Sequence, residues 1–98
     1  MIFIPVSIIA TVRVKEGKME EAKKVLKQIV PKIKDSEPGT LEYIPHIVKQ
    51  DPNVIIFYEK YSDSDALKGH TKSLEKNMAA FMPLLEPGMD IKYLEEII

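Results

Sequence analysis

The stretch LEYIPHIVKQDPNVIIFYEKY, Leu41 to Tyr61, decides the fold because it contains two strands joined by a short turn. In its first part, the side chains alternate between two faces with the period of two that is typical of a strand. One face carries Leu41, Tyr43 and Ile47, and the other carries Glu42, Ile44, His46 and Val48. The segment KQDPN supplies the connection, so the stretch predicts an antiparallel hairpin.

The second strand of the hairpin, Val54 to Tyr61, is apolar on both faces. One face carries Val54, Ile56 and Tyr58, and the other carries Ile55, Phe57 and Tyr61. A strand of this kind is covered by other parts of the protein on both sides. Pro45, in the first strand, has no backbone donor for a ladder, which places that strand at a sheet edge or at a bulge.

A strand and a helix are predicted upstream of the hairpin. Apolar residues recur at every second position from Val6 to Val14, and after the turn KEGK they recur at three- and four-residue steps, which predicts a helix over about 18 to 35. Pro31 lies inside this helix. It is either a proline tolerated near the helix end, or it causes a kink or a loosened last turn. The turn SEPGT ends the helix, and we expect Gly39 to adopt positive φ there.

Two helical pieces and a last strand are predicted downstream of the hairpin. Ser62 and Asp65 resemble a capping box and start a short helix that runs to His70. A second piece carries one apolar stripe, made of Leu74, Met78, Phe81, Met82 and Leu85. The breakers in EPGM end it, and alternation over residues 89–94 predicts the fourth strand.

The predicted order β-α-β-β-α-β is that of an α+β, ferredoxin-like sandwich with a four-stranded antiparallel sheet, formed by a single domain over residues 1–98. Its two helices can cover only one face of the sheet. Ile9, Ile44 and the two-sided strand from Val54 to Tyr61 present apolar side chains on the other face. We therefore expect a homodimer in which a second copy covers the open sheet face.

Composition excludes several other classes of protein. The 98 residues carry 14 basic and 15 acidic side chains, interspersed along the chain, so no basic stripe is available for nucleic acid. Without cysteine there is neither a disulfide framework nor a thiolate metal site, and the two histidines have no short-spaced carboxylate cluster, so no metal is expected. The apolar start is interrupted by Pro5 and is too short to span a bilayer, which indicates a cytoplasmic protein without membrane contact.

The run PGTLEYIPHIVKQDPNVIIFYEKYSDSDALKGH, Pro38 to His70, resembles the antibiotic biosynthesis monooxygenase family. Members show a proline-glycine turn, a strand with an aromatic residue, a hairpin, a glutamate with an aromatic residue, and then an acidic cap and a histidine. The resemblance extends to VRVKEGKMEE, Val12 to Glu21, and so covers most of the chain. It implies a dimeric α+β barrel with a small hydrophobic pocket between sheet and helices in each subunit.

Matching single positions to the family gives a mixed result. Glu59 and Tyr61 stand where members have glutamate followed by an aromatic residue, and His70 stands where many have a histidine. Asn77 falls nearest to the second histidine that many members carry, and Phe81 takes the later aromatic position. The residues that hold haem in the haem-degrading branch correspond to Ala10 and Phe81, which disfavours haem, and no cofactor is expected.

These positions give a hypothesis for the chemistry. His70 can shuttle a proton, and Tyr61 and Glu59 can orient it or hold a substrate hydroxyl. The resemblance implies a cofactor-free monooxygenase acting on a small phenolic, quinol-like or polyketide aromatic compound. The predicted substrate contacts are Phe57, Asn77, Met78, Phe81 and Met82.

Other interpretations remain open at this point. His70 can equally be a partly exposed histidine near a helix C-terminus, and the methionine and phenylalanine stripe is more often core than pocket. Glu59 and Tyr61 can be cross-strand or cap partners. The alternative functions are a dimeric ligand-binding module without turnover and an isomerase of a small hydroxy-carbonyl compound that uses the same His70 and Tyr61. A His70 that faces a closed apolar cavity favours an enzyme.

Overall fold

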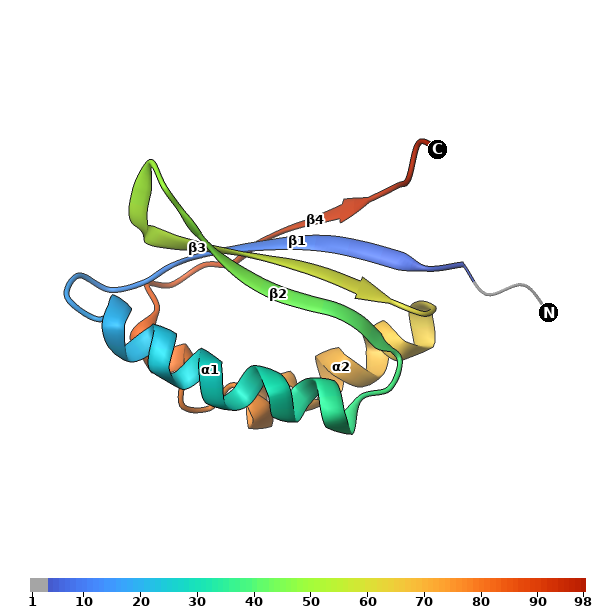
Figure 1. Ribbon diagram of the computed structural model, residues 1–98, viewed down its shortest axis with the longest axis horizontal. Coiled ribbons are helices and arrows are strands. Elements are labelled where there is room, and N and C mark those ends of the chain that lie inside the picture. Colours follow the sequence, from blue (N-terminus) through green and yellow to red (C-terminus); the bar gives the residue numbers. More distant parts are fainter. Residues whose placement is uncertain (1–3) are drawn as a thin grey trace.

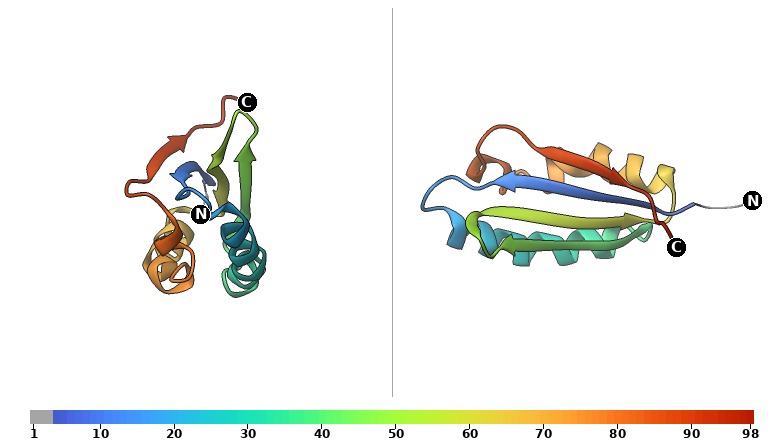
Figure 2. Two further views of the ribbon diagram at one scale, coloured as in Figure 1. Left: turned by 90° about the vertical axis from the view of Figure 1, so that its left-hand side faces the viewer. Right: turned by 90° about the horizontal axis from the view of Figure 1, so that it is seen from above.

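The computed structural model describes residues 4–98 and has the predicted order β-α-β-β-α-β (Figure 1). Its elements are β1 (Val6–Arg13), α1 (Met19–Ser36), β2 (Thr40–Val48), β3 (Asp51–Tyr61), α2 (Ser64–Asn77), the short 3-10 helix η1 (Met82–Leu84) and β4 (Asp90–Leu94). All strand pairs are antiparallel, in the order β2-β3-β1-β4, and both helices lie on the same face of the sheet (Figure 2). The predicted ferredoxin-like α+β fold is confirmed.

Register places the apolar sets of the strands as their alternation predicts. In the central pair, Ala10 lies opposite Phe57 and Val12 lies opposite Ile55, and all four side chains are buried under the helices. Strand β2 lies at the edge of the sheet, which is the position that the missing backbone donor of Pro45 predicted.

The hairpin differs in two details from the prediction. Its connection is only Lys49 and Gln50, because the strand pairing begins at Asp51 rather than at Val54. Asp51 is held there by its ion pair with Arg13 of β1, at 2.7 Å. The register also shifts between Thr40 and Glu42, and this bulge leaves Leu41 exposed instead of aligned with Tyr43.

The helices also differ from the prediction. Helix α1 continues through Pro31 to Ser36, as a tolerated proline allows. Helix α2 is capped by Asp63, whose side chain accepts from the Ala66 backbone N–H at 2.8 Å, and not by Ser62, whose own N–H bonds to Gly39 at the sheet end. It runs without a break through His70 and ends at Asn77, and the apolar stripe continues in the separate 3-10 helix η1, which contains Pro83.

The turn between α1 and β2 approaches α2 very closely. A Cβ atom at Gly39 would lie 2.6 Å from the Cβ of Ala66, closer than van der Waals contact allows. Gly39 does not have the predicted positive φ, which occurs instead at Gly17 and Gly88. Glycine is therefore needed at position 39 for packing and not for its backbone freedom.

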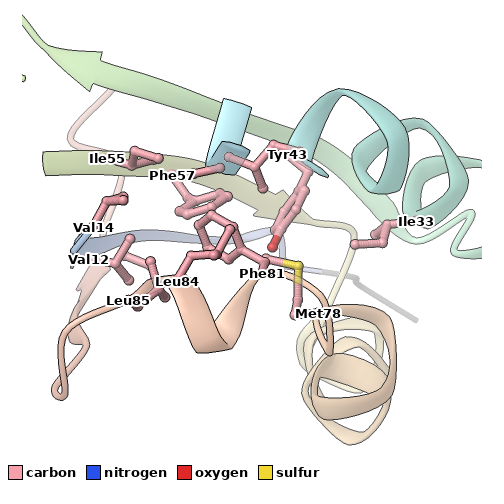
Figure 3. Close-up of a cluster of buried hydrophobic side chains, with 13 residues drawn as sticks. Val12, Val14, Ile33, Tyr43, Ile55, Phe57, Met78, Phe81, Leu84 and Leu85 are labelled. Atoms are coloured by element: carbon pink, nitrogen blue, oxygen red, sulfur yellow. The ribbon is translucent and has the colours of Figure 1, made fainter. Parts of the chain in front are cut away.

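The hydrophobic core lies between the sheet and the two helices (Figure 3). Phe57 of β3 is its centre, with Tyr43 at a ring-centroid distance of 5.5 Å and Phe81 packed edge-on at 5.9 Å. Ile33 of α1 and Met78, next to the end of α2, are also buried there.

The opposite face of the sheet carries no helix (Figure 2). Ile9, Val54, Ile56 and Tyr58 are half-buried on it, and Ile44 is 40% exposed. Within residues 4–98, no helix is long and apolar enough to cross a membrane.

Candidate active site

His70 is buried in the middle of α2, with 3% of its surface exposed. Its ring packs between two tyrosines from the sheet, with centroid distances of 5.0 Å to Tyr43 and 5.2 Å to Tyr61. The interpretation of His70 as a partly exposed histidine near a helix end is therefore wrong. The helix that was expected to stop at this residue continues for two more turns and presses it against the sheet.

One ring nitrogen of His70 bonds to Glu37, the residue that follows α1. The distance from His70 Nδ1 to Glu37 Oε1 is 2.8 Å. Thr40 Oγ1 donates to the same carboxylate oxygen at 2.9 Å, and Asn77 Nδ2 donates to the other at 3.2 Å. Glu37 therefore has hydrogen-bond partners on both carboxyl oxygens, which fixes the orientation of its side chain.

The other ring nitrogen faces a second carboxyl group, Glu59 of β3. His70 Nε2 lies 3.9 Å from Glu59 Oε1, and the Tyr61 hydroxyl donates to that same oxygen at 2.5 Å. Glu59 and Tyr61 are two residues apart on one strand, so their side chains share the face that α2 covers.

Burial dominates the electrostatics of this pair. It raises the pKa of Glu59, while the hydrogen bond from Tyr61 and the charge of His70 act in the opposite direction. Burial also raises the pKa of Tyr61, and its bond to Glu59 raises that pKa further, since the neutral hydroxyl is the form that donates. Tyr61 therefore remains protonated at neutral pH.

Glu37, His70, Glu59 and Tyr61 form one buried chain of groups that can hold and pass protons. Because Glu37 accepts from Nδ1, the Nε2 atom of His70 is the nitrogen left free to exchange a proton. Its 3.9 Å separation from Glu59 exceeds a hydrogen bond, so Nε2 is not committed to that carboxyl group.

A mostly enclosed cavity of about 120 Å³ lies beside this chain, between the sheet and α2. Its polar wall comprises Tyr43, Glu59, His70 and Thr71. Its apolar wall comprises Ile8, Ala10, Phe57, Leu67, Leu74 and Met78. Four exposed apolar side chains also line it, namely Met82, Met89, Ile91 and Tyr93, and these form the side that is open to solvent.

The structure brings together part of the predicted site. His70 and Glu59 line the cavity, with Phe57, Met78 and Met82. Tyr61 reaches the site through its bond to Glu59. Asn77 and Phe81, by contrast, are not cavity-lining residues: Asn77 bonds to Glu37, and Phe81 is fully buried against Phe57 in the core.

Sequence reasoning missed Glu37, Thr40 and Tyr43 as members of the site. Glu37 and Thr40 belong to the turn SEPGT, which shows no more than the end of a helix. Their role depends on the close approach of that turn to α2 at Gly39, which brings Glu37 to a histidine 33 positions later. Tyr43 could have been found from the sequence, because the alternation along its strand places its side chain on the face that packs against the core.

A larger hollow of about 690 Å³ lies elsewhere, between α1 and the edge strand β2. Leu26, Val30, Pro45 and Ile47 make it apolar, but His46 is its sole titratable side chain besides lysines, and no acid-base chain borders it. Within residues 4–98, no three His, Asp or Glu side chains are grouped as metal ligands would be. The smaller cavity is therefore the candidate active site, because only this one of the two is bordered by the buried acid-base groups.

The protein is thus a small α+β, ferredoxin-like sandwich in which a buried histidine and Glu59 line an apolar cavity, an arrangement that can exchange a proton with a bound ligand. The chain belongs to the antibiotic biosynthesis monooxygenase family, whose family model matches residues 5–82. A search of curated proteins gives no significant match.

Solved structures agree with this family. A proposed antibiotic biosynthesis monooxygenase from Caulobacter crescentus CB15 is 31% identical, with a TM-score of 0.84 over 96% of this chain and 91% of that chain. A conserved protein from Methanosarcina mazei Go1 shares the fold at 18% identity, with a TM-score of 0.83 over 96% and 94% of the two chains. A conserved protein from Bacteroides thetaiotaomicron VPI-5482, described as a possible oxidoreductase, does so at 20% identity, with a TM-score of 0.77 over 94% and 97%.

Proposed function

We propose that the protein is a monooxygenase that works without a cofactor on a small phenolic or quinol-like compound, with His70 as the acid-base group. The observation that carries this proposal is the position of His70, which is buried, held by Glu37 and placed on the wall of an apolar cavity. Membership of the monooxygenase family supports the reaction class.

In the proposed reaction, Nε2 of His70 removes the proton of a substrate hydroxyl, and the electron pair stays on the oxygen. The electron-rich anion then reacts with dioxygen. One oxygen atom forms a new bond to a ring carbon and the other leaves as water, so that a quinol and dioxygen give a hydroxyquinone and water. The apolar wall excludes bulk water from the reactive anion.

The buried partners of His70 have separate roles in this mechanism. Glu37 keeps the proton of the neutral ring on Nδ1 and stabilises the charged ring once Nε2 has taken up a proton. Glu59, with its raised pKa and its bond from Tyr61, is placed to receive that proton or to return it.

We also propose that the protein is a homodimer joined through the open sheet face. Its half-buried apolar side chains, Ile9, Val54, Ile56 and Tyr58 with the more exposed Ile44, need a cover that neither helix supplies. A second copy related by a twofold axis supplies the same apolar surface in return.

An isomerase of a small hydroxy-carbonyl compound is the second candidate. The observation in its favour is that the chain from Glu37 to Tyr61 moves protons and has no feature that is specific for dioxygen. A ligand-binding module without turnover would have the same cavity.

Oxygen consumption with a panel of quinols, phenols and anthrones tests the proposal. We expect uptake by the wild-type protein and its loss in His70→Ala, while the control His46→Ala, which removes an exposed histidine of β2, retains it. Dimerisation is measured on the same samples. An absence of uptake by the wild-type protein across the panel would contradict the oxygenase and favour the isomerase or the binding module.

A further inference from the structure

Tyr43 is a buried tyrosine whose hydroxyl has no hydrogen-bond partner among residues 4–98. The side chain is 3% exposed and extends from β2 toward Met78 (Figure 3). Every fully enclosed side-chain oxygen and nitrogen atom of the described residues is paired, so the unpaired Tyr43 hydroxyl retains access to the cavity that its side chain lines. A hydroxyl that reaches an apolar cavity and has no protein partner there is available to bond to a ligand oxygen.

The two carboxyl groups near Tyr43 are already occupied by other donors. Glu59 accepts a hydrogen bond from Tyr61, and Glu37 accepts hydrogen bonds from Thr40, Asn77 and His70. Tyr43 is close enough to Glu59 and Glu37 to be affected by their charges but bonds to neither. Its hydroxyl is thus left as a free donor beside two carboxyl groups that accept hydrogen bonds from other side chains.

The Tyr43 hydroxyl also keeps its proton. Burial raises its pKa, and the negative charges of Glu59 and Glu37 raise it further. A neutral donor fixed in a water-poor cavity beside an acid-base group is the arrangement that stabilises an oxyanion.

We propose that the Tyr43 hydroxyl donates a hydrogen bond to the substrate oxygen whose proton passes to His70, and so stabilises the phenolate that forms. This proposal rests on the proposed function in taking His70 as the base. The substrate O–H bond breaks, the proton goes to Nε2 and the electron pair stays on oxygen, while the Tyr43 O–H bond remains intact.

The cavity size narrows the class of substrate. About 120 Å³ is close to the volume that encloses one benzene ring and well below the pockets that hold drug-sized ligands. The substrate is accordingly a single-ring phenol or quinol with small substituents. Within the quinol panel, single-ring compounds are then better substrates than three-ring anthrones.

Binding of 4-nitrophenol tests the role of Tyr43 without turnover, because its phenolate has a visible absorbance. We expect Tyr43→Phe to weaken binding of the phenolate about tenfold to a hundredfold, which is the effect of one hydrogen bond to a charged group. Nitrobenzene, which has the same shape but no acidic oxygen, should bind the wild-type protein and the variant within about twofold. Tyr58→Phe, a change on the opposite face of the sheet, is the matched control and should change neither affinity.

Two further measurements keep the result interpretable. The melting temperature of Tyr43→Phe should equal or exceed that of the wild-type protein, since the removed hydroxyl has no protein partner. Incorporation of 3-fluorotyrosine at position 43 gives a stronger donor and should tighten phenolate binding. Unchanged phenolate affinity in Tyr43→Phe, or an equal loss of nitrobenzene binding, would overturn the proposal.

Failure of this proposal and failure of the oxygenase can be distinguished. If the wild-type protein takes up no oxygen while Tyr43→Phe still loses phenolate binding, the oxyanion site stands without the oxygenase. If oxygen uptake depends on His70 but Tyr43→Phe keeps the full turnover number, the oxygenase stands and Tyr43 is not its oxyanion donor.

Discussion

At the scale of single residues, the proton of His70 is controlled by a glutamate that lies outside the regular elements. Glu37 holds Nδ1 and is itself fixed by Thr40 and Asn77, so three side chains serve to orient one ring. In the proposed mechanism this arrangement leaves Nε2 as the proton-accepting atom, so we expect activity to depend on residue 37 as well as on the histidine.

Glu37→Gln tests that dependence. The glutamine amide can donate to Nδ1, which favours the tautomer with its proton on Nε2 and removes the free base. We expect kcat/KM for the best quinol of the panel to fall about a hundredfold, within the range that general acid-base catalysis contributes.

The control for this variant is Glu21→Gln, on the exposed side of α1, which should leave kcat/KM unchanged. A Glu37→Gln protein with wild-type activity and an unaltered pH profile would show that Glu37 does not set the tautomer.

At the scale of elements, the structure depends on contacts that alternation and periodicity cannot show. Strands β1 to β3 and α1 were predictable from the spacing of apolar residues, because one face of each packs on the core. Three other features could not be predicted in this way, because they depend on which elements meet in space. They are the extent of α2, the burial of His70 and the close approach of the turn at Gly39 to α2. Asp63 sets the start of α2 through its side-chain cap, which the competing signal at Ser62 concealed.

The contact at Gly39 predicts a large effect from one methyl group. Gly39→Ala forces a Cβ against that of Ala66, and we expect unfolding in urea to lose about 1–3 kcal/mol of stability, as overpacked sites do. Restoring the space with Ala66→Gly in the same chain should recover part of the loss, less the cost of a helical glycine.

Gly69→Ala is the matched control, because a Cβ at that position of α2 meets nothing within 4 Å. It should leave stability unchanged or raise it by up to about 1 kcal/mol, the gain of alanine over glycine in a helix. Equal effects of the two alanine substitutions would contradict a packing role for Gly39.

At the scale of the whole molecule, the two faces of the sheet lie in different environments. One face is buried under both helices and carries the cavity, and the other presents half-buried apolar side chains (Figure 2). The open face was predictable from Ile9, Ile44 and the two-sided β3, and its cover by a second copy stays a prediction.

Two isoleucines of β2 offer a matched test of the dimer. Ile44 and Ile47 are both 40% exposed, but Ile44 pairs with Tyr58 on the open face and Ile47 with Ile55 on the helix side. A lysine buried in an apolar interface is costly, so Ile44→Lys should give a monomer in sedimentation experiments and Ile47→Lys a dimer. Monomeric wild-type protein, or the same assembly for both variants, would contradict an interface on the open face.

The position of β4 in the chain has a consequence for synthesis on the ribosome. Ile91 and Tyr93 of β4, with the adjacent Met89, line the solvent-facing side of the cavity, and β4 follows every other element of the site in the sequence. A nascent chain that has not yet released β4 can pair β1 with β3, but the other edge of β1 stays unpaired and the proton-transfer groups lack one wall. The cavity is therefore completed last, after the elements that hold its acid-base groups have been translated.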